Sequence, residues 1–112
     1  MKKDLEKFKI YKNQSIKDAI GLIRLNECRC IFVFEENDLI IGSFSEGDIL
    51  STLLKGININ APIEKFCNYS FSFLNNYDVV KAKELFKKKG IPLIPIIKNK
   101  KLIDIITISD VL

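Results

Sequence analysis

The stretch Gly42-Ser43-Phe44-Ser45-Glu46-Gly47-Asp48-Ile49 decides the fold. It follows the apolar residues Leu39–Ile41, which predict a β-strand. Ser45 and Asp48 have the spacing of a capping box, in which a hydroxyl and a side-chain carboxylate three residues later satisfy free N–H groups at a helix start. The stretch therefore predicts a strand that passes directly into a helix, and Lys55-Gly56 is a suitable end for that helix.

A β-hairpin is predicted immediately before this helix, and it recurs near the end of the chain. Cys30–Phe34 is a run of β-formers, 35–38 is a polar turn and 39–44 is the return strand. The second hairpin has a strand over 92–97, a polar turn over 98–101 and a return strand over 102–106. There Asp104-x-x-Thr107-x-x-Asp110 takes the place of Gly42-x-x-Ser45-x-x-Asp48 and opens a final helix.

A short strand and a helix precede each hairpin. In the first half, 8–11 alternates apolar and polar residues, and Ser15 caps a helix that ends near Asn26. In the second half, 70–73 alternates in the same way and Asp78 caps a helix. Helical spacing predicts which residues face the core: Ala19, Ile20, Leu22 and Ile23 in the first helix, Ile49, Leu50, Leu53 and Leu54 in the second, and Val79, Ala82, Leu85 and Phe86 in the third.

The chain is thus an internal duplication of strand–helix–strand–strand–helix, with one repeat over residues 1–58 and the other over 59–112. Its fold class is α/β (α+β). Halves this short cannot bury a stable core alone, so we expect them to pack with pseudo-two-fold symmetry, as two small sheets with helices between them and outside. The last helix stops at Leu112, soon after Asp110, so we expect a piece of a longer protein that continues C-terminally.

Composition excludes several classes of protein. The chain has 112 residues, 47% of them hydrophobic, and a formal net charge of +4, so it can build a core and does not indicate nucleic-acid binding. Three cysteines and no histidine predict reduced thiols, no metal site and no catalytic residues. The charged N-terminus is not a signal peptide, and no apolar run is long enough to span a membrane. We therefore expect a cytoplasmic protein that is not itself an enzyme.

The duplicated strand–helix–hairpin–helix, with Ser45-x-x-Asp48 and Thr107-x-x-Asp110 at equivalent helix starts, resembles a tandem pair of CBS domains, also called a Bateman module. The resemblance covers nearly the whole chain. It implies a regulatory module that binds an adenine nucleotide (AMP, ADP or ATP), needs no other cofactor and forms a homodimer through its helices. Such a ligand can regulate an attached enzyme only if it prefers one arrangement of the module.

The resemblance also implies roles for particular residues. Asp48 and Asp110 would accept hydrogen bonds from ribose hydroxyls, and Ser45 and Thr107 would hold phosphate beside free helix N–H groups. The start of the hairpin in the same repeat would contact adenine: Ile91, Pro92 and Leu93 in the second repeat, and their counterparts Arg29, Cys30 and Ile31 in the first. The arginine could also reach phosphate or lie over a ring face. Capping alone would also explain the serine, threonine and aspartates, because a helix start needs a cap whether or not a ligand is present.

Two departures from the family pattern favour an alternative, a module without ligand that serves only in dimerisation or docking. Asp104 replaces the small glycine of the motif and would put a carboxylate near a bound phosphate. Leu50 and Ser51 stand where related motifs have two arginines. The intact hydroxyl and aspartate in each repeat favour nucleotide binding, so both alternatives stay open.

A second resemblance concerns the attached enzyme. Asp4-Leu5-x-x-Phe8-x-Ile10, Phe44–Ile49 and Leu53–Ile57 are similar to the N-terminal CBS pair of bacterial sugar nucleotidyltransferases. This implies a C-terminal catalytic domain with a role in sugar nucleotide biosynthesis. The alternative parent is a sugar-phosphate isomerase, whose CBS pair lies at the C-terminus and would not explain Met1 at the start of this chain.

Overall fold

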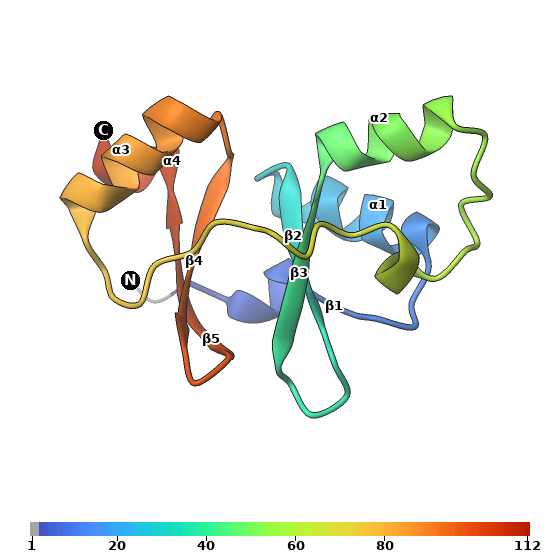
Figure 1. The fold of residues 1–112 in the computed structure, drawn as a ribbon, viewed down its shortest axis with the longest axis horizontal. Helices are drawn as coiled ribbons and strands as arrows, with labels where there is room; N and C mark the ends of the chain where they lie inside the picture. Colours follow the sequence, from blue (N-terminus) through green and yellow to red (C-terminus); the bar gives the residue numbers. More distant parts are fainter. Residues whose placement is uncertain (1–2) are drawn as a thin grey trace.

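The computed structural model describes residues 3–112 and contains the predicted order of helices and strands, apart from the segment 70–73 (Figure 1). The first part comprises η1 (Leu5–Phe8), β1 (Lys9–Tyr11), α1 (Ile16–Asn26), β2 (Cys30–Phe34), β3 (Ile40–Ser45), α2 (Glu46–Leu54) and η2 (Ile63–Lys65). The second comprises α3 (Val79–Lys89), β4 (Leu93–Lys98), β5 (Lys101–Thr107) and α4 (Ile108–Val111).

The strands form two small sheets. In the first, β2 is central and pairs parallel with β1 and antiparallel with β3. In the second, β4 and β5 form an antiparallel hairpin. The registers of the two hairpins correspond: Cys30 lies opposite Ser45, and Leu93 lies opposite Thr107. Because Ser45 and Thr107 begin equivalent helices, Cys30 and Leu93 are the structurally equivalent residues, one position away from the correspondence predicted from the sequence.

The predicted strand over 70–73 is wrong. Only Leu74, just beyond it, makes a parallel bridge to Ile96 of β4. The Leu74 N–H donates to Pro95 O at 3.0 Å, and the Ile97 N–H donates to Leu74 O at 2.9 Å. Pro95 has no N–H, so β4 cannot offer a neighbouring strand a regular series of donors at this edge. The segment instead runs across the molecule as the connection between the two halves (Figure 1).

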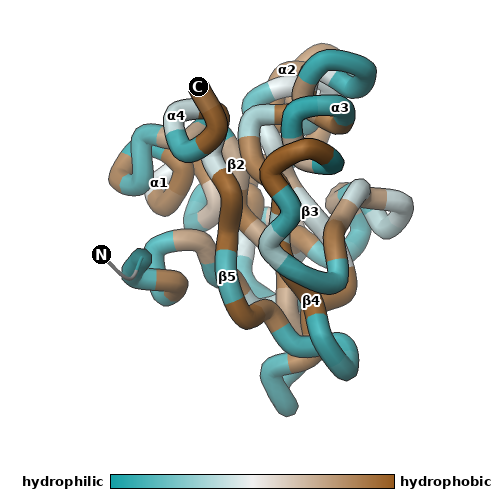
Figure 2. The backbone as a smooth tube through the Cα atoms, turned by 90° about the vertical axis from the view of Figure 1, so that its left-hand side faces the viewer, coloured by the Kyte–Doolittle hydropathy of each residue, from teal (hydrophilic) through white to brown (hydrophobic). Residues whose placement is uncertain are grey.

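The sheets pack face to face, and the helices lie outside them. Cys30, Phe32 and Phe34 of β2 form one core cluster with residues of β4 and β5, including Leu93 and Ile105. The opposite face of the first sheet packs on α1, and that of the second packs on α3 and α4. The apolar stretches of the strands gather in the middle of the molecule (Figure 2). The prediction of helices between the sheets is therefore wrong, because the strands' own side chains fill that space.

The inner face of α2 also differs from the prediction. Thr52 is buried, and Ile49 packs on the core cluster beside α1. Leu50, Leu53 and Leu54 were predicted to be inside, but they are 62%, 52% and 89% exposed. A helix nine residues long that starts at the sheet edge presents only the 49/52 face to the core, and its leucines lie on the outer side. Val79 of α3, also predicted to be inside, is 39% exposed.

Gly42 marks a close approach between β3 and the connecting segment. Ser43 N–H donates to Asn68 O at 3.0 Å, and Asn68 N–H donates to Ser43 O at 2.8 Å. A Cβ atom on Gly42 would lie 2.8 Å from Cys67 Sγ and 3.1 Å from Asn68 O. The absent side chain therefore lets the connecting segment lie directly on the strand that leads to Ser45.

Candidate functional site

A cleft of about 420 Å³ lies between the two halves of the molecule. One side is the end of β3 and the start of α2, with Ser45 and Asp48. The other side is the end of α3 and the start of β4, from Lys89 to Leu93. The connecting segment closes it with Asn68, Ser70, Phe71 and Ser72, and Cys30, Phe32 and Ser43 of the first sheet also line it. The cleft therefore combines residues that are far apart in the sequence.

The capping box of α2 holds Asp48 at the wall of this cleft. Ser45 N–H donates to Asp48 Oδ2 at 2.9 Å, the Ser45 hydroxyl donates to the same oxygen at 3.1 Å, and Asp48 N–H faces Ser45 Oγ at 3.4 Å. These contacts fix both side chains at the helix start, where the Glu46 N–H donates to Arg29 O at 3.1 Å. A hydroxyl, a carboxylate and a helix N-terminus thus face the same space.

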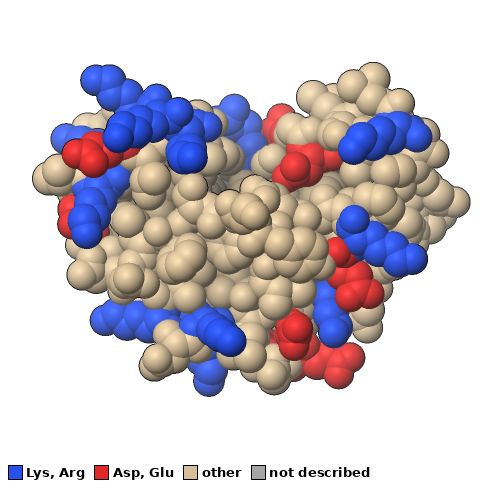
Figure 3. Space-filling view, viewed as in Figure 1, with Lys and Arg blue, Asp and Glu red and all other residues tan. Residues whose placement is uncertain are grey.

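The opposite wall is apolar and aromatic. Phe71 contacts Phe32 with ring centroids 6.3 Å apart and ring planes tilted by 50°. Pro92 and Leu93 lie across the cleft from the serine and aspartate. Lys89 is the single cation that lines the cleft within residues 3–112. Lysine side chains gather over α3 (Figure 3), so this edge of the cleft is positively charged.

Cys30 lines the cleft as a thiol. It is only 4% exposed, and burial, with a smaller contribution from the negative charge of Asp48, raises its pKa to about 12. A thiol with this pKa is protonated near neutral pH and is a poor nucleophile. Cys30 therefore contributes apolar surface to the cleft.

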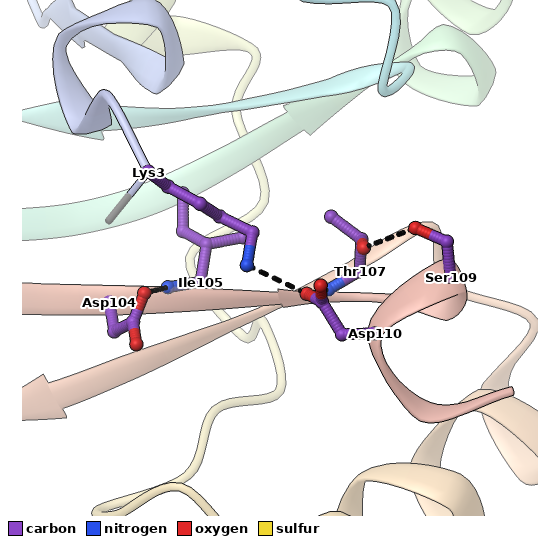
Figure 4. Close-up of polar contacts among 6 residues, drawn as sticks. All are labelled: Lys3, Asp104, Ile105, Thr107, Ser109 and Asp110. Atoms are coloured by element: carbon purple, nitrogen blue, oxygen red, sulfur yellow. Dashed lines mark hydrogen bonds and ion pairs between the residues drawn. The ribbon is translucent and has the colours of Figure 1, made fainter. Parts of the chain in front are cut away.

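The equivalent position in the second half has a different environment (Figure 4). Thr107 N–H donates to Asp110 Oδ2 at 2.7 Å, which repeats the bond between Ser45 and Asp48. Thr107 Oγ1 lies 2.9 Å from Ser109 Oγ, and Lys3 Nζ lies 2.8 Å from Asp110 Oδ2. Asp110 therefore has an internal cationic partner, whereas Asp48 lines an open cleft.

The structure separates the predicted site residues into groups. Ser45, Asp48, Cys30 and the segment 91–93 lie together in the cleft. Ile91, Pro92 and Leu93, which are predicted to serve the repeat of Thr107, line the cleft with the serine and aspartate of the other repeat, and Leu93 also pairs with Thr107 in the second sheet. Arg29 lies beside the cleft and lines a smaller adjoining cavity of about 210 Å³ with Glu46 and Pro92. Ile31 is fully buried in the core beside α1 and is not among the residues that line the cleft.

Sequence reasoning missed Lys89 and the cleft side of the connecting segment, with Phe71 between Ser70 and Ser72. The alternation of serine and phenylalanine over 70–73 was a usable signal, since it places polar and aromatic groups on opposite sides of an extended chain. The sequence did not indicate that this chain would cross the first sheet. The position of Lys89 was also a usable signal. It directly precedes Gly90-Ile91, the residues that lead into the second hairpin.

Residues 3–112 contain neither a cluster of metal-binding side chains nor a helix that could cross a membrane. Among residues 3–112, no group of three or more His, Cys, Asp and Glu side chains is arranged to hold a metal ion. Over the same range, every helix is too short or too polar to cross a bilayer.

The fold and the cleft define a duplicated α+β module with a ligand-sized space between its repeats. The family model described as "CBS domain" matches residues 1–55 and 72–112, and the chain belongs to the CBS domain family. Members of this family are regulatory modules. A search of curated protein sequences finds no match to this chain.

Solved structures have the same fold at low sequence identity. The CBS domains of a transcriptional regulator from Streptococcus pneumoniae align with a TM-score of 0.81 at 15% identity, over 99% of this chain and 92% of that one. A CBS domain protein from Pyrobaculum aerophilum complexed with AMP aligns with a TM-score of 0.79 at 18% identity, over 91% of this chain and 80% of that one. CBSX2 in complex with AMP aligns with a TM-score of 0.76 at 19% identity, over 91% of this chain and 81% of that one.

Proposed function

We propose that the cleft binds an adenine nucleotide, AMP, ADP or ATP, and that the module reports this ligand to an attached enzyme. The observation that carries the proposal is the meeting of Ser45, Asp48 and the start of α2 with an aromatic and apolar wall in one cleft of about 420 Å³. Two proteins with the same fold are complexed with AMP.

Each part of a nucleotide has a chemical counterpart in the cleft. Asp48 accepts hydrogen bonds from the ribose hydroxyls, because a carboxylate offers several lone pairs to a vicinal diol. The partial positive charge at the start of α2 and the Lys89 ammonium attract phosphate. The adenine ring packs against Phe71 and Pro92 on the opposite wall.

We further propose that the attached enzyme is a sugar-phosphate nucleotidyltransferase whose catalytic domain follows this module. The similarity of Phe44–Ile49 and Leu53–Ile57 to the CBS pair of those enzymes supports this assignment. A sugar-phosphate isomerase is the alternative parent. In either enzyme, the nucleotide changes activity only by the difference in its affinity for the active and inactive arrangements.

A thermal-shift titration of the chain with AMP, ADP, ATP and GMP tests nucleotide binding. A ligand that binds only the folded state raises the Tm, and the rise continues with the logarithm of ligand concentration above Kd. We expect a rise with at least one adenine nucleotide and a smaller rise with GMP, with inorganic phosphate as the control for simple anion binding. No rise with any adenine nucleotide at millimolar concentration would overturn the proposal.

A second candidate function is dimerisation or docking without a ligand. The outer side of α2 favours it, because Leu50, Leu53 and Leu54 are more than half exposed and lie close together on one short helix. Adjacent exposed leucines mark an interaction surface, and we propose that a second copy of this chain covers them as a homodimer. Analytical ultracentrifugation tests this: we expect a dimer that Leu54→Glu converts to a monomer, and a monomeric parent chain would exclude it.

A further inference from the structure

The two aspartates at equivalent helix starts have different partners. Asp48 accepts its capping bonds from Ser45 and lines the open cleft. Asp110 accepts the equivalent bond from Thr107 and, at the same oxygen, a contact from Lys3 Nζ at 2.8 Å. The side chains of Lys3 and Asp110 are only 26% and 25% exposed. In Figure 4 the lysine extends from the N-terminal segment to the carboxylate at the start of α4.

This contact uses the group that a ribose would need. A partly buried ammonium–carboxylate contact is a charge-assisted hydrogen bond, which is stronger than a bond from a neutral hydroxyl. A vicinal diol that used both oxygens of Asp110 would have to displace the ammonium from Oδ2 and leave the lysine charge without its partner, whereas at Asp48 the corresponding contact comes from the neutral Ser45 hydroxyl. The Thr107 hydroxyl is also engaged, at 2.9 Å from Ser109 Oγ.

The segment beside each aspartate differs: the N-terminal segment brings Lys3 to Asp110, and the connecting segment brings Asn68, Ser70 and Phe71 to the cleft at Asp48. Cys28, in the turn between α1 and β2, lies near this contact; burial mainly raises its pKa, and the charges of Lys3 and Asp110 make smaller contributions. At Asp48, the corresponding space is the cleft bounded by Lys89, Gly90 and Pro92.

We propose that each chain binds a single nucleotide, in the cleft at Asp48, because Lys3 acts as the built-in partner of Asp110 at the equivalent position. This inference rests on the proposed function and assigns the ligand to one of two related positions. The matching sequence patterns in the two repeats thus have different uses: one binds a ligand, and the other fastens the N-terminal segment to the last helix.

Isothermal titration calorimetry of the chain with AMP tests the assignment through two matched variants. Asp48→Ala and Asp110→Ala each remove one capping carboxylate. We expect one AMP per chain in the parent, at least about tenfold weaker binding for Asp48→Ala, and unchanged stoichiometry with affinity within about twofold for Asp110→Ala. Two molecules of AMP per chain, or equal weakening by the two variants, would overturn the inference while leaving nucleotide binding established.

A second measurement does not depend on nucleotide. The carboxyl ¹³C signal of Asp110, followed by NMR against pH, reports its ionisation directly. We expect Lys3→Ala to move the Asp110 titration to higher pH. No change at Asp110 would show that Lys3 is not its partner and would also overturn the inference. If the parent chain binds no adenine nucleotide at all, the proposed function fails, and this titration still decides whether Lys3 engages Asp110.

Discussion

The two helix starts that share the pattern hydroxyl-x-x-Asp end in different surroundings. At Ser45, the connecting segment and the end of α3 leave a cleft open in front of Asp48. At Thr107, Lys3 reaches the equivalent Asp110. The backbone bond from the capping residue to the aspartate is the same in both, at 2.9 Å and 2.7 Å. The local pattern therefore specifies a helix cap, and residues from other elements decide whether the aspartate can meet a ligand.

Gly42 and Asp104, three residues before Ser45 and Thr107, also have different surroundings. The connecting segment lies on Gly42, where a side chain would touch Cys67 and the backbone of Asn68. Asp104 is at the corresponding place in β5, is half-buried, and its carboxylate accepts from Ile105 N–H at 2.8 Å. The small residue of the first motif is thus explained by the passing chain.

Among the substitutions that test this difference between the repeats, Gly42→Ala should have the largest effect on the free energy of unfolding. Its Cβ would lie 3.1 Å from a backbone oxygen that is itself bonded to Ser43. Overpacking of this kind costs about 1–3 kcal/mol, which exceeds the gain of about 0.5–1 kcal/mol from replacing a strand glycine. Urea unfolding should show a net loss of about 1–2 kcal/mol for Gly42→Ala.

Two control variants test whether this loss comes from the contact between Gly42 and the connecting segment. Asp104→Ala should change the free energy of unfolding by no more than about 0.5 kcal/mol, because the chain does not cross there. Gly42→Ala should cost less free energy of unfolding in a Cys67→Ala background than in the parent. Cys67→Ala removes the sulfur that would lie 2.8 Å from the new Cβ. Equal losses for Gly42→Ala and Asp104→Ala would contradict the role of the connecting segment.

These differences also define how much could be predicted from the sequence. Helix starts at Ser15, Ser45 and Asp78 were predicted correctly because a cap is made by residues a few positions apart. The grouping of Pro92 with Ser45 was missed because it depends on how the two sheets face each other, which local patterns do not encode. Ile31 packs beside α1 whereas Cys30 faces the other sheet, because neighbouring residues of a strand point to opposite faces.

The predicted burial of Leu50, Leu53 and Leu54 in α2 was wrong for a related reason. Helical periodicity shows that residues share a face, but it does not show which face meets the core when both are apolar. Ile49 and Thr52 pack inward, and Leu50 and Leu53 remain outside. The contact between Lys3 and Asp110 joins the two ends of the chain and had no local signal at all.

A smaller expected effect concerns the phosphate side of the cleft. Lys88 and Lys89 of α3 are both exposed, but only Lys89 lines the cleft. We expect Lys89→Ala to weaken AMP binding about fivefold, or about 1 kcal/mol, because it removes a charged partner of the phosphate. Lys88→Ala changes the net charge equally and should have an effect below about twofold. Equal weakening in calorimetry would show that only the general positive charge of α3 attracts the ligand.

The smallest expected effect is the pH dependence of the stability that the contact between Lys3 and Asp110 contributes. Burial alone would raise the pKa of Asp110, but the bonds from Lys3 and Thr107 outweigh it and lower the pKa below its ordinary value. A carboxyl group whose pKa is lowered by folding stabilises the protein above its unfolded pKa of about 3.9 and loses that contribution as the pH falls through the folded pKa. Cys28, the other titratable neighbour, has a raised pKa and stays protonated throughout this acidic range.

The Tm difference between the parent and Lys3→Ala should therefore be constant near neutral pH and shrink in acid, where protonated Asp110 no longer attracts the lysine. The pair is partly exposed, so its contribution is no more than about 1 kcal/mol and decreases with added salt. Lys88→Ala is the control and should give no such pH dependence. A Tm difference that persists unchanged into acid would mean that Lys3 stabilises the last helix by packing alone, and the second position would then be closed by shape and not by charge.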